Sequence, residues 1–204
     1  MPNLFGQDIN SVEEITDAFR RHGDAVRMTY RARYVWDESS TDPYAGTRLE
    51  RPAAMIGNPP AVIYPWEQVF VSAASCAGSD FPMLAKHFGV RLERVEFVVE
   101  GVFDPRGEFA GLTGLEAPAD AAPAYVSLHL RTTVTSDAAE SDLRRIHRRV
   151  VDHNMVLGAL RGIPRTDRLE IERPAYDGPP DVVAAPSRST IVRNSSSGST
   201  GLTR

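Results

Sequence analysis

The chain has 204 residues, of which 42% are apolar and 25% charged, and its formal net charge is −4. This length and composition predict one main globular domain with an apolar core, and they exclude a fibrous or largely disordered chain. The acidic balance argues against nucleic acid as a partner, and no apolar run reaches the roughly 18 residues of a membrane-spanning helix. Since the amino terminus lacks a signal-peptide pattern, we expect a cytoplasmic protein that binds neither nucleic acid nor membrane.

The first part of the chain predicts a short helix followed by two strands. Ser11 and Glu14 have the spacing of a capping box, and apolar residues recur after them at helical spacing until Gly23. Residues 25–36 alternate loosely between apolar and polar side chains and are rich in β-branched and aromatic types, as strands are. A polar turn region separates them from a second candidate strand at 47–56.

The middle of the chain predicts a long helix followed by two further strands. A helix is expected over 65–89, with a proline well placed at its first position, although Pro82 should kink this helix or split it in two. Residues 90–103 and 124–135 alternate as strands do. The segment 104–123 between them is rich in Gly, Pro and Ala, so we expect a long mobile loop there.

The last part of the chain predicts two helices and a final strand. Ser136 and Asp137 form a suitable N-cap for a helix that ends near Val151, and a second helical segment follows at 154–160. Residues 168–173 make a short strand. This order of strands and helices predicts an α+β fold.

The chain divides into three parts by composition. We expect an amino-terminal helical extension at 1–24, the main domain at 25–174 and a tail at 175–204. The tail is rich in Pro, Ser and Gly, which can bury little apolar area, so we expect it to be flexible.

Cys76 is the single cysteine of the chain and lies among small residues of the predicted long helix. One thiol cannot form an internal disulfide and fits a reducing compartment. A free cysteine is often a small buried apolar side chain, so composition leaves open whether Cys76 is a nucleophile or part of the core. The five histidines have no metal-ligand spacing and Gly-rich phosphate motifs are absent, so we expect no metal and no cofactor.

The segment 58–104 resembles the signature of the OsmC/Ohr family, the osmotically inducible and organic hydroperoxide resistance proteins. In that signature a glutamate near a helix start precedes a cysteine among small residues, followed by Gly-Val and a strand that ends in Gly-X-Phe-Asp. Glu67, Cys76, Gly89 and the stretch 101–104 fall at matching places. Residues 154–162, NMVLGALRG, are similar to the family's Cys-Pro-Val motif, and the resemblance covers roughly 25–173.

The resemblance implies a fold and an activity. The fold would be an intertwined homodimer in which antiparallel sheets wrap central helices and active sites lie at the interface. The activity would be thiol peroxidase chemistry toward organic hydroperoxides, in which a thiolate attacks the O–O bond and a second cysteine captures the sulfenic acid. Asn154 stands in the position of that second cysteine, so a peroxidase cycle would need an external thiol reductant.

The resemblance also implies an arginine that stabilises the thiolate and a glutamate that holds this arginine. Glu67 matches the glutamate, Arg48 is our first choice for the arginine, and Arg51 is the second. Each has a plainer alternative, since an acid near a helix start is favoured by the macrodipole and strand or loop arginines are common. His153 lies next to Asn154 and would reach the thiol if both residues sit at an irregular helix start.

The residues at the start of the long helix offer a candidate pocket for a small apolar substrate. This pocket would include Tyr64, Trp66, Phe70 and Phe81, although a stripe of this kind is more often core. Small and apolar residues on more than one face of 69–77 also favour an obligate homodimer, because a single sheet cannot cover them all.

Three functions remain open at this point. The first is a one-cysteine peroxidase of the OsmC/Ohr type, that is, an oxidoreductase that acts in the response to oxidative stress. The second is another cysteine-nucleophile enzyme on the same fold, which would catalyse hydrolysis, acyl transfer or bond cleavage in a specialised metabolic pathway. The third is a non-enzymatic dimeric protein that binds a small molecule.

Overall fold

The computed structural model describes residues 3–4, 7–8, 10–41, 46–51, 63–120 and 124–175. Its elements in chain order are β1 (Asn3–Leu4), β2 (Gln7–Asp8), α1 (Val12–His22), the 3-10 helix η1 (Gly23–Val26), β3 (Met28–Asp37), β4 (Arg48–Glu50), α2 (Pro65–His87), β5 (Arg94–Phe103), α3 (Pro105–Thr113), β6 (Tyr125–Thr135), α4 (Glu140–His153), α5 (Met155–Ala159) and β7 (Arg165–Glu172). The predicted α+β class is confirmed. The predicted tail at 175–204 lies almost entirely outside the described residues.

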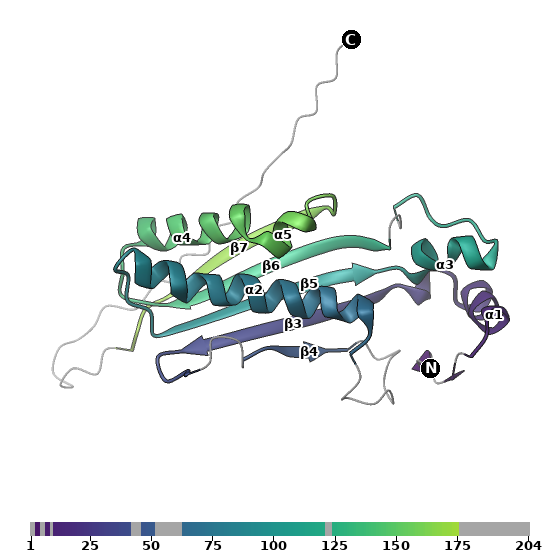
Figure 1. Ribbon diagram of the computed structural model, residues 1–204, viewed down its shortest axis with the longest axis horizontal. Helices are drawn as coiled ribbons and strands as arrows, with labels where there is room; N and C mark the ends of the chain where they lie inside the picture. The colour runs from purple at the N-terminus through teal and green to yellow at the C-terminus, as the bar shows by residue number, and fades with distance from the viewer. Residues whose placement is uncertain are drawn as a thin grey trace, which may run out of the picture.

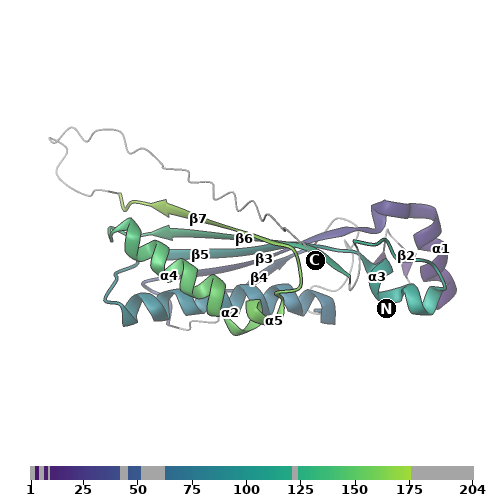
Figure 2. The same ribbon diagram turned by 90° about the horizontal axis from the view of Figure 1, so that it is seen from above.

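One five-stranded sheet organises the molecule, with the strand order β4-β3-β5-β6-β7. Its neighbours pair antiparallel except β6 and β7, which are parallel and are joined through α4 and α5. The helices α2, α4 and α5 all lie on the same face of this sheet (Figures 1 and 2). A separate antiparallel pair is formed by β1 and β2.

The core lies between that face of the sheet and the helices α2, α4 and α5. Alternate residues of β3, beginning with Met28, turn inward, as the period of a strand requires. A side chain on Gly78 would overlap the ring of Tyr34, and one on Gly101 would overlap Phe70, so both glycines permit close approach of helix and sheet. These contacts set the position of α2, which carries the thiol.

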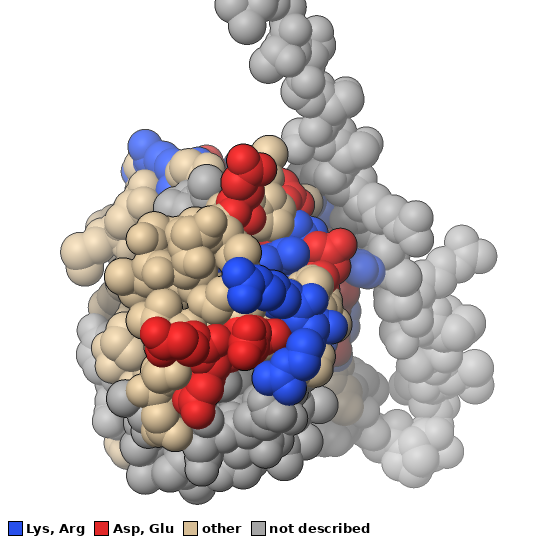
Figure 3. All heavy atoms as spheres, turned by 90° about the vertical axis from the view of Figure 1, so that its right-hand side faces the viewer, with Lys and Arg blue, Asp and Glu red and all other residues tan. Residues whose placement is uncertain are grey.

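The far end of the sheet carries α1 and α3, which pack on each other (Figure 1). The capping box at the start of α1 is present as predicted, and Phe19 of α1 lies 6.4 Å from Phe109 of α3 between ring centroids. At this end, acidic and basic side chains lie next to one another (Figure 3). No large field of one sign covers this described face.

The prediction of a loop over 104–123 is wrong in its first half, because α3 forms there. Asp104 accepts a hydrogen bond from the backbone N–H of Arg106 (3.0 Å), Pro105 takes the first helical position, and Gly114 ends the helix with φ of 66°. These are ordinary start and stop signals, and they act here although the apolar pattern of α3 is weak.

The Asp104 carboxylate is buried and joins the start of α3 to Arg27, the residue between η1 and β3. Arg27 Nε and Arg106 Nη2 donate to Asp104 Oδ2 at 3.0 and 2.8 Å. Burial acts to raise the pKa of Asp104, but the hydrogen bonds from Arg106 and Arg27 outweigh it and lower the pKa. A charged Asp104 therefore stabilises this end of the fold.

Other differences from the sequence prediction concern element ends. The long helix continues through Pro82 as one element, and Phe81 and Ala85 on either side of this proline are buried in the core. Only Arg48–Glu50 of the predicted strand 47–56 is described as strand, and 52–56 lies outside the described residues.

The N-cap predicted for the next helix is also wrong. Ser136 Oγ donates to the carbonyl of Arg91 (2.6 Å) and accepts from the N–H of Ala138 (3.1 Å), so it closes the connection between β6 and α4. The helix begins later, after Ala139. The final strand begins at Arg165, three residues earlier than predicted, because it pairs along β6. Among the described helices, none is long and apolar enough to cross a membrane.

Candidate functional site

Cys76 lies in the middle of α2 with its side chain half-buried and its thiol free. Asn154 Nδ2 donates a hydrogen bond to Cys76 Sγ at 3.1 Å. Asn154 sits at the junction between α4 and α5, where the backbone leaves the helical conformation. The structure therefore places at the sulfur the same residue that stands where the resemblance puts a second cysteine.

The Asn154 carboxamide has its orientation determined by its neighbours. Its Oδ1 accepts from the N–H groups of Val156 and Leu157, both at 3.0 Å, and so caps α5. Because these two donors require an oxygen, the nitrogen must face the other way, toward Cys76 and Asp80. The distance from Asn154 Nδ2 to Asp80 Oδ2 is 2.7 Å, and the Asn154 residue is 3% exposed.

Asp80 is a site residue that the sequence reasoning missed. It follows Cys76 by one helical turn on α2, and residues at i and i+4 lie on the same face of a helix. That spacing was a usable signal for an acidic side chain beside the thiol. What the spacing could not indicate is the shared partner, Asn154, which comes from a distant part of the chain.

Glu67 forms an ion pair with Arg51 and not with Arg48. Arg51 Nε donates to Glu67 Oε1 at 2.7 Å and Nη2 donates to Oε2 at 2.9 Å, which is a bidentate pair. The Glu67 side chain has no exposed area, and Arg51 is 15% exposed. The hydrogen bonds to Glu67 raise the pKa of Arg51, so its positive charge is secure. Arg48 is exposed on β4 and lines a hollow elsewhere on the surface.

The ion pair and the thiol are separated along α2. Glu67 precedes Cys76 by nine residues, which corresponds to about 13 Å along a helix axis. The Glu67 carboxylate also accepts from the N–H of Tyr64 at 2.9 Å, so it lies toward the start of the helix, away from Cys76. Within the described chain, the pair and the thiol are therefore two distinct groups.

A hollow of about 450 Å³ adjoins the Asn154–Asp80 hydrogen bond, between the second half of α2 and the end of α4. Its lining residues are Asp80, Met83, Leu84, His87, Phe88, Arg149, His153 and Asn154. His153 is thus near Asn154 but exposed. Among the described residues, the hydrogen bond on Cys76 Sγ comes from Asn154 and not from this imidazole.

The aromatic residues predicted to line a pocket divide into two groups. Tyr64 and Trp66 stack at the start of α2, with ring centroids 4.9 Å apart and planes 4° apart. Phe70 and Phe81 have no exposed area and belong to the core. Tyr125 packs edge-on against Phe70, and burial raises its pKa to about 12. In this structure these aromatic side chains pack α2 onto the sheet.

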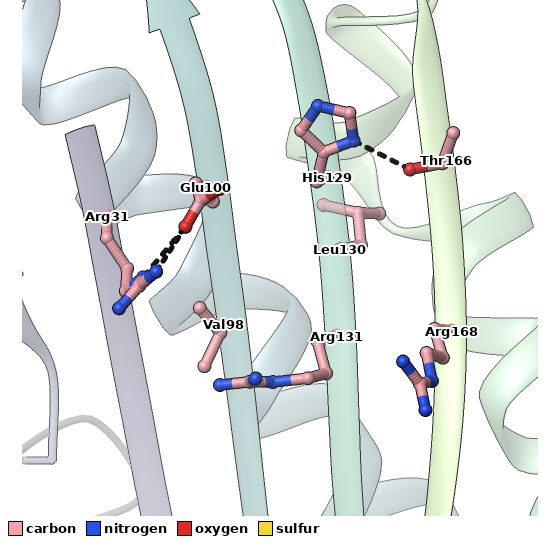
Figure 4. Close-up of a pocket in the computed structure, with 8 residues that line it drawn as sticks. All are labelled: Arg31, Val98, Glu100, His129, Leu130, Arg131, Thr166 and Arg168. Carbon is pink, nitrogen blue, oxygen red and sulfur yellow. Dashed lines mark hydrogen bonds and ion pairs between the residues drawn. The ribbon is translucent and has the colours of Figure 1, made fainter. Parts of the chain in front are cut away.

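Another hollow, of about 230 Å³, lies on the open face of the sheet, across from the helices (Figure 4). Arg31 Nε donates to Glu100 Oε2 at 2.9 Å, and His129 Nδ1 lies 2.8 Å from Thr166 Oγ1. This hollow and Cys76 lie on opposite faces of the sheet, so the hollow is not part of the site around the thiol. Within the described residues, no three His, Cys, Asp or Glu side chains gather as metal ligands.

Comparisons with known proteins give a family match. A family model described as OsmC-like protein matches residues 63–167, more than half of the chain, and this range contains Glu67, Cys76 and Asn154. A search of curated proteins finds no match.

A comparison with solved structures matches, among others, three proteins at low identity. An OsmC-like protein from Mycoplasma pneumoniae is 13% identical, with 53% of this chain and 70% of that chain covered and a TM-score of 0.42. A hypothetical protein from Aquifex aeolicus VF5 is 13% identical, with 70% and 98% covered and a TM-score of 0.43. An OsmC-like hydroperoxide resistance protein from Jannaschia sp. CCS1 is 12% identical, with 75% and 97% covered and a TM-score of 0.45.

Proposed function

Because the chain belongs to the OsmC-like protein family, we propose that it is a thiol-dependent peroxidase that reduces organic hydroperoxides, with Cys76 as the nucleophile. One observation carries the proposal. A half-buried thiol in the family-matching segment receives an N–H hydrogen bond at 3.1 Å, and such a donor stabilises negative charge on sulfur. The substrate would be a small apolar hydroperoxide.

The reaction balances with an external thiol. The Cys76 thiolate attacks the terminal, hydrogen-bearing oxygen of ROOH, the O–O bond breaks, and the alkoxide leaves as ROH after it takes a proton, which gives the Cys76 sulfenic acid. A thiol R′SH then condenses with the sulfenic acid and releases water, which leaves a mixed disulfide. A second thiol attacks this disulfide, and Cys76 returns as a thiol with R′SSR′ as product. The external thiol is needed because Cys76 is the only cysteine in the chain.

We further propose that the protein works as a homodimer in which Arg51 serves the thiol of the other chain. The reason is the separation of about 13 Å along α2 between Glu67, which holds Arg51, and Cys76. A two-fold axis that crosses α2 between Glu67 and Cys76 would run the two copies of the helix in opposite directions and bring the Glu67 end of each copy beside the Cys76 of the other. The partner subunit's Arg51 would then approach Cys76.

Complementation between inactive variants tests this arrangement. Cys76→Ser and Arg51→Ala should each be inactive alone. A mixed dimer, isolated with two different affinity tags, should regain one working site, since it joins an intact Cys76 to an intact Arg51 across the interface. A mixed dimer as inactive as its parents contradicts the shared site, and a monomer in sedimentation at micromolar concentration contradicts the dimer.

The peroxidase activity itself is tested with cumene hydroperoxide and a dithiol. Wild-type protein should consume the peroxide, and protein oxidised without thiol should gain the mass of one oxygen at Cys76. Cys76→Ser should do neither. If the wild type consumes no peroxide and gains no oxygen, the proposal fails.

A second candidate is a cysteine-nucleophile hydrolase or acyl transferase on the same fold. The observation that favours it is the hollow beside Asn154, which has His153 on its wall and room for a small substrate. An imidazole there would serve as a proton donor or acceptor. A panel of activated aryl esters, with acylation of Cys76 followed by mass, separates this activity from the peroxidase.

A further inference from the structure

We propose that Asp80 is a positioning residue that holds the Asn154 carboxamide in place as the hydrogen-bond donor to the sulfur of Cys76. The proposal rests on the proposed function in one respect, namely that Cys76 is the nucleophile. It assigns a role to Asp80, and it assigns to Asn154 the task of stabilising negative charge on the sulfur.

The first step in the argument is the completeness of the hydrogen bonding at Asn154. A side-chain amide offers an oxygen with two lone pairs and a nitrogen with two hydrogens. The oxygen accepts from Val156 and Leu157, while one hydrogen goes to Cys76 and the other to Asp80. Both lone pairs and both hydrogens of the Asn154 carboxamide are therefore used, so the group is held at both ends. A carboxamide turned the other way round would make fewer of these hydrogen bonds.

The second step concerns what each partner contributes. The two backbone donors hold only the oxygen end of Asn154 and leave the nitrogen end free to tilt about it. The Asp80 carboxylate binds that nitrogen end at 2.7 Å, a charged acceptor at short range. With both ends held, the remaining N–H points at Cys76 Sγ, and the donor is in place before any charge develops on the sulfur.

The third step is the opposing effect of the Asp80 charge. Both the carboxylate and the sulfur are bonded to the same nitrogen, at 2.7 and 3.1 Å, so they lie at most about 6 Å apart, where like charges disfavour one another. Asp80 therefore helps the thiolate through geometry and opposes it through charge. A neutral residue that keeps the acceptor oxygen separates these two effects.

Alkylation of Cys76 by iodoacetamide, a neutral reagent, measures the reactivity of the sulfur without any peroxide. Asp80→Ala and Asn154→Ala should each slow alkylation about fivefold, the effect of losing one hydrogen bond. The double variant should be no slower than Asn154→Ala alone, because both changes act through the same N–H. Asp80→Asn keeps an acceptor oxygen without the charge and should react at least as fast as the wild type.

Asp152→Ala is the matched control, an exposed aspartate near the same helix end that does not line the hollow. It should leave the rate unchanged. A second measurement needs only the wild type, so it still tests the proposal if a variant does not fold. In the wild type, the Asn154 carboxamide protons should exchange slowly with deuterated water, and their NMR chemical shifts should change when Cys76 is alkylated.

Three results would overturn the assignment. These are an Asp80→Ala rate equal to the wild type, an Asp80→Asn rate as low as that of Asp80→Ala, and losses that multiply in the double variant. The predicted pattern of alkylation in a protein that never reacts with hydroperoxide would refute the peroxidase while supporting the role of Asp80.

Discussion

Replacing Arg51 by methionine should lower the free energy of unfolding by about 3–5 kcal/mol, because it leaves a buried carboxylate without its cation. Glu67 has no exposed area and accepts two hydrogen bonds from Arg51, at 2.7 and 2.9 Å. At such a distance the attraction between unit charges is about 6 kcal/mol for an effective dielectric constant of about 20. The N–H of Tyr64 still binds Glu67 in the variant, so we expect the lower end of the range.

A double-mutant cycle identifies the source of this loss. Glu67→Leu combined with Arg51→Met replaces the ion pair by apolar side chains, and it should recover much of the stability that Arg51→Met alone loses. We expect an interaction energy of about 2–3 kcal/mol between the two positions. Arg48→Met serves as the matched control, and because Arg48 is exposed it should change the free energy of unfolding by less than about 0.5 kcal/mol.

Urea unfolding followed by circular dichroism, at one fixed protein concentration, gives these free energies. Equal losses in Arg48→Met and Arg51→Met, or additive losses in the cycle, would refute the reasoning. The choice between the two arginines would then be open again.

Three further substitutions test other parts of the structure. Gly78→Ala should lower the free energy of unfolding by about 1–3 kcal/mol in urea, because its new methyl group overlaps the ring of Tyr34; an unchanged midpoint would contradict the close contact. Asp104 has a lowered pKa in the folded state, so its stabilising effect is present above about pH 4, its unfolded value, and is lost as the pH falls through the folded value. Asp104→Asn should therefore be less stable than the wild type at pH 7 and show a flatter dependence of unfolding midpoint on pH below about 4; parallel pH curves would count against this. Asn154→Cys should form a disulfide with Cys76 after treatment with hydroperoxide, since the side chain at position 154 already contacts the sulfur; a sulfenic acid that persists in this variant would show that the two positions do not meet.

Local signals predicted most of the elements. The capping box of Ser11 and Glu14 starts α1, and Pro65 takes the first position of α2, because both depend on side chains within one turn of the helix end. Strand alternation located β3, β5 and β6. The helix α3 differs from the predicted loop because its start and end depend on the caps Asp104 and Gly114, while its Gly- and Ala-containing sequence has only a weak apolar pattern.

The sequence by itself determined the α+β class, the family resemblance and the candidates Cys76 and Glu67, because these depend on residue type and spacing along one helix or strand. Tertiary structure decided which arginine binds Glu67. Arg51 reaches Glu67 only because β4 and the start of α2 pack together, and in that packing Arg48 stays exposed on β4. It also decided that Asn154 joins Cys76 to Asp80. A carboxamide can turn either end toward a sulfur, and only the backbone donors of α5 and the carboxylate on α2, brought together by folding, select the nitrogen.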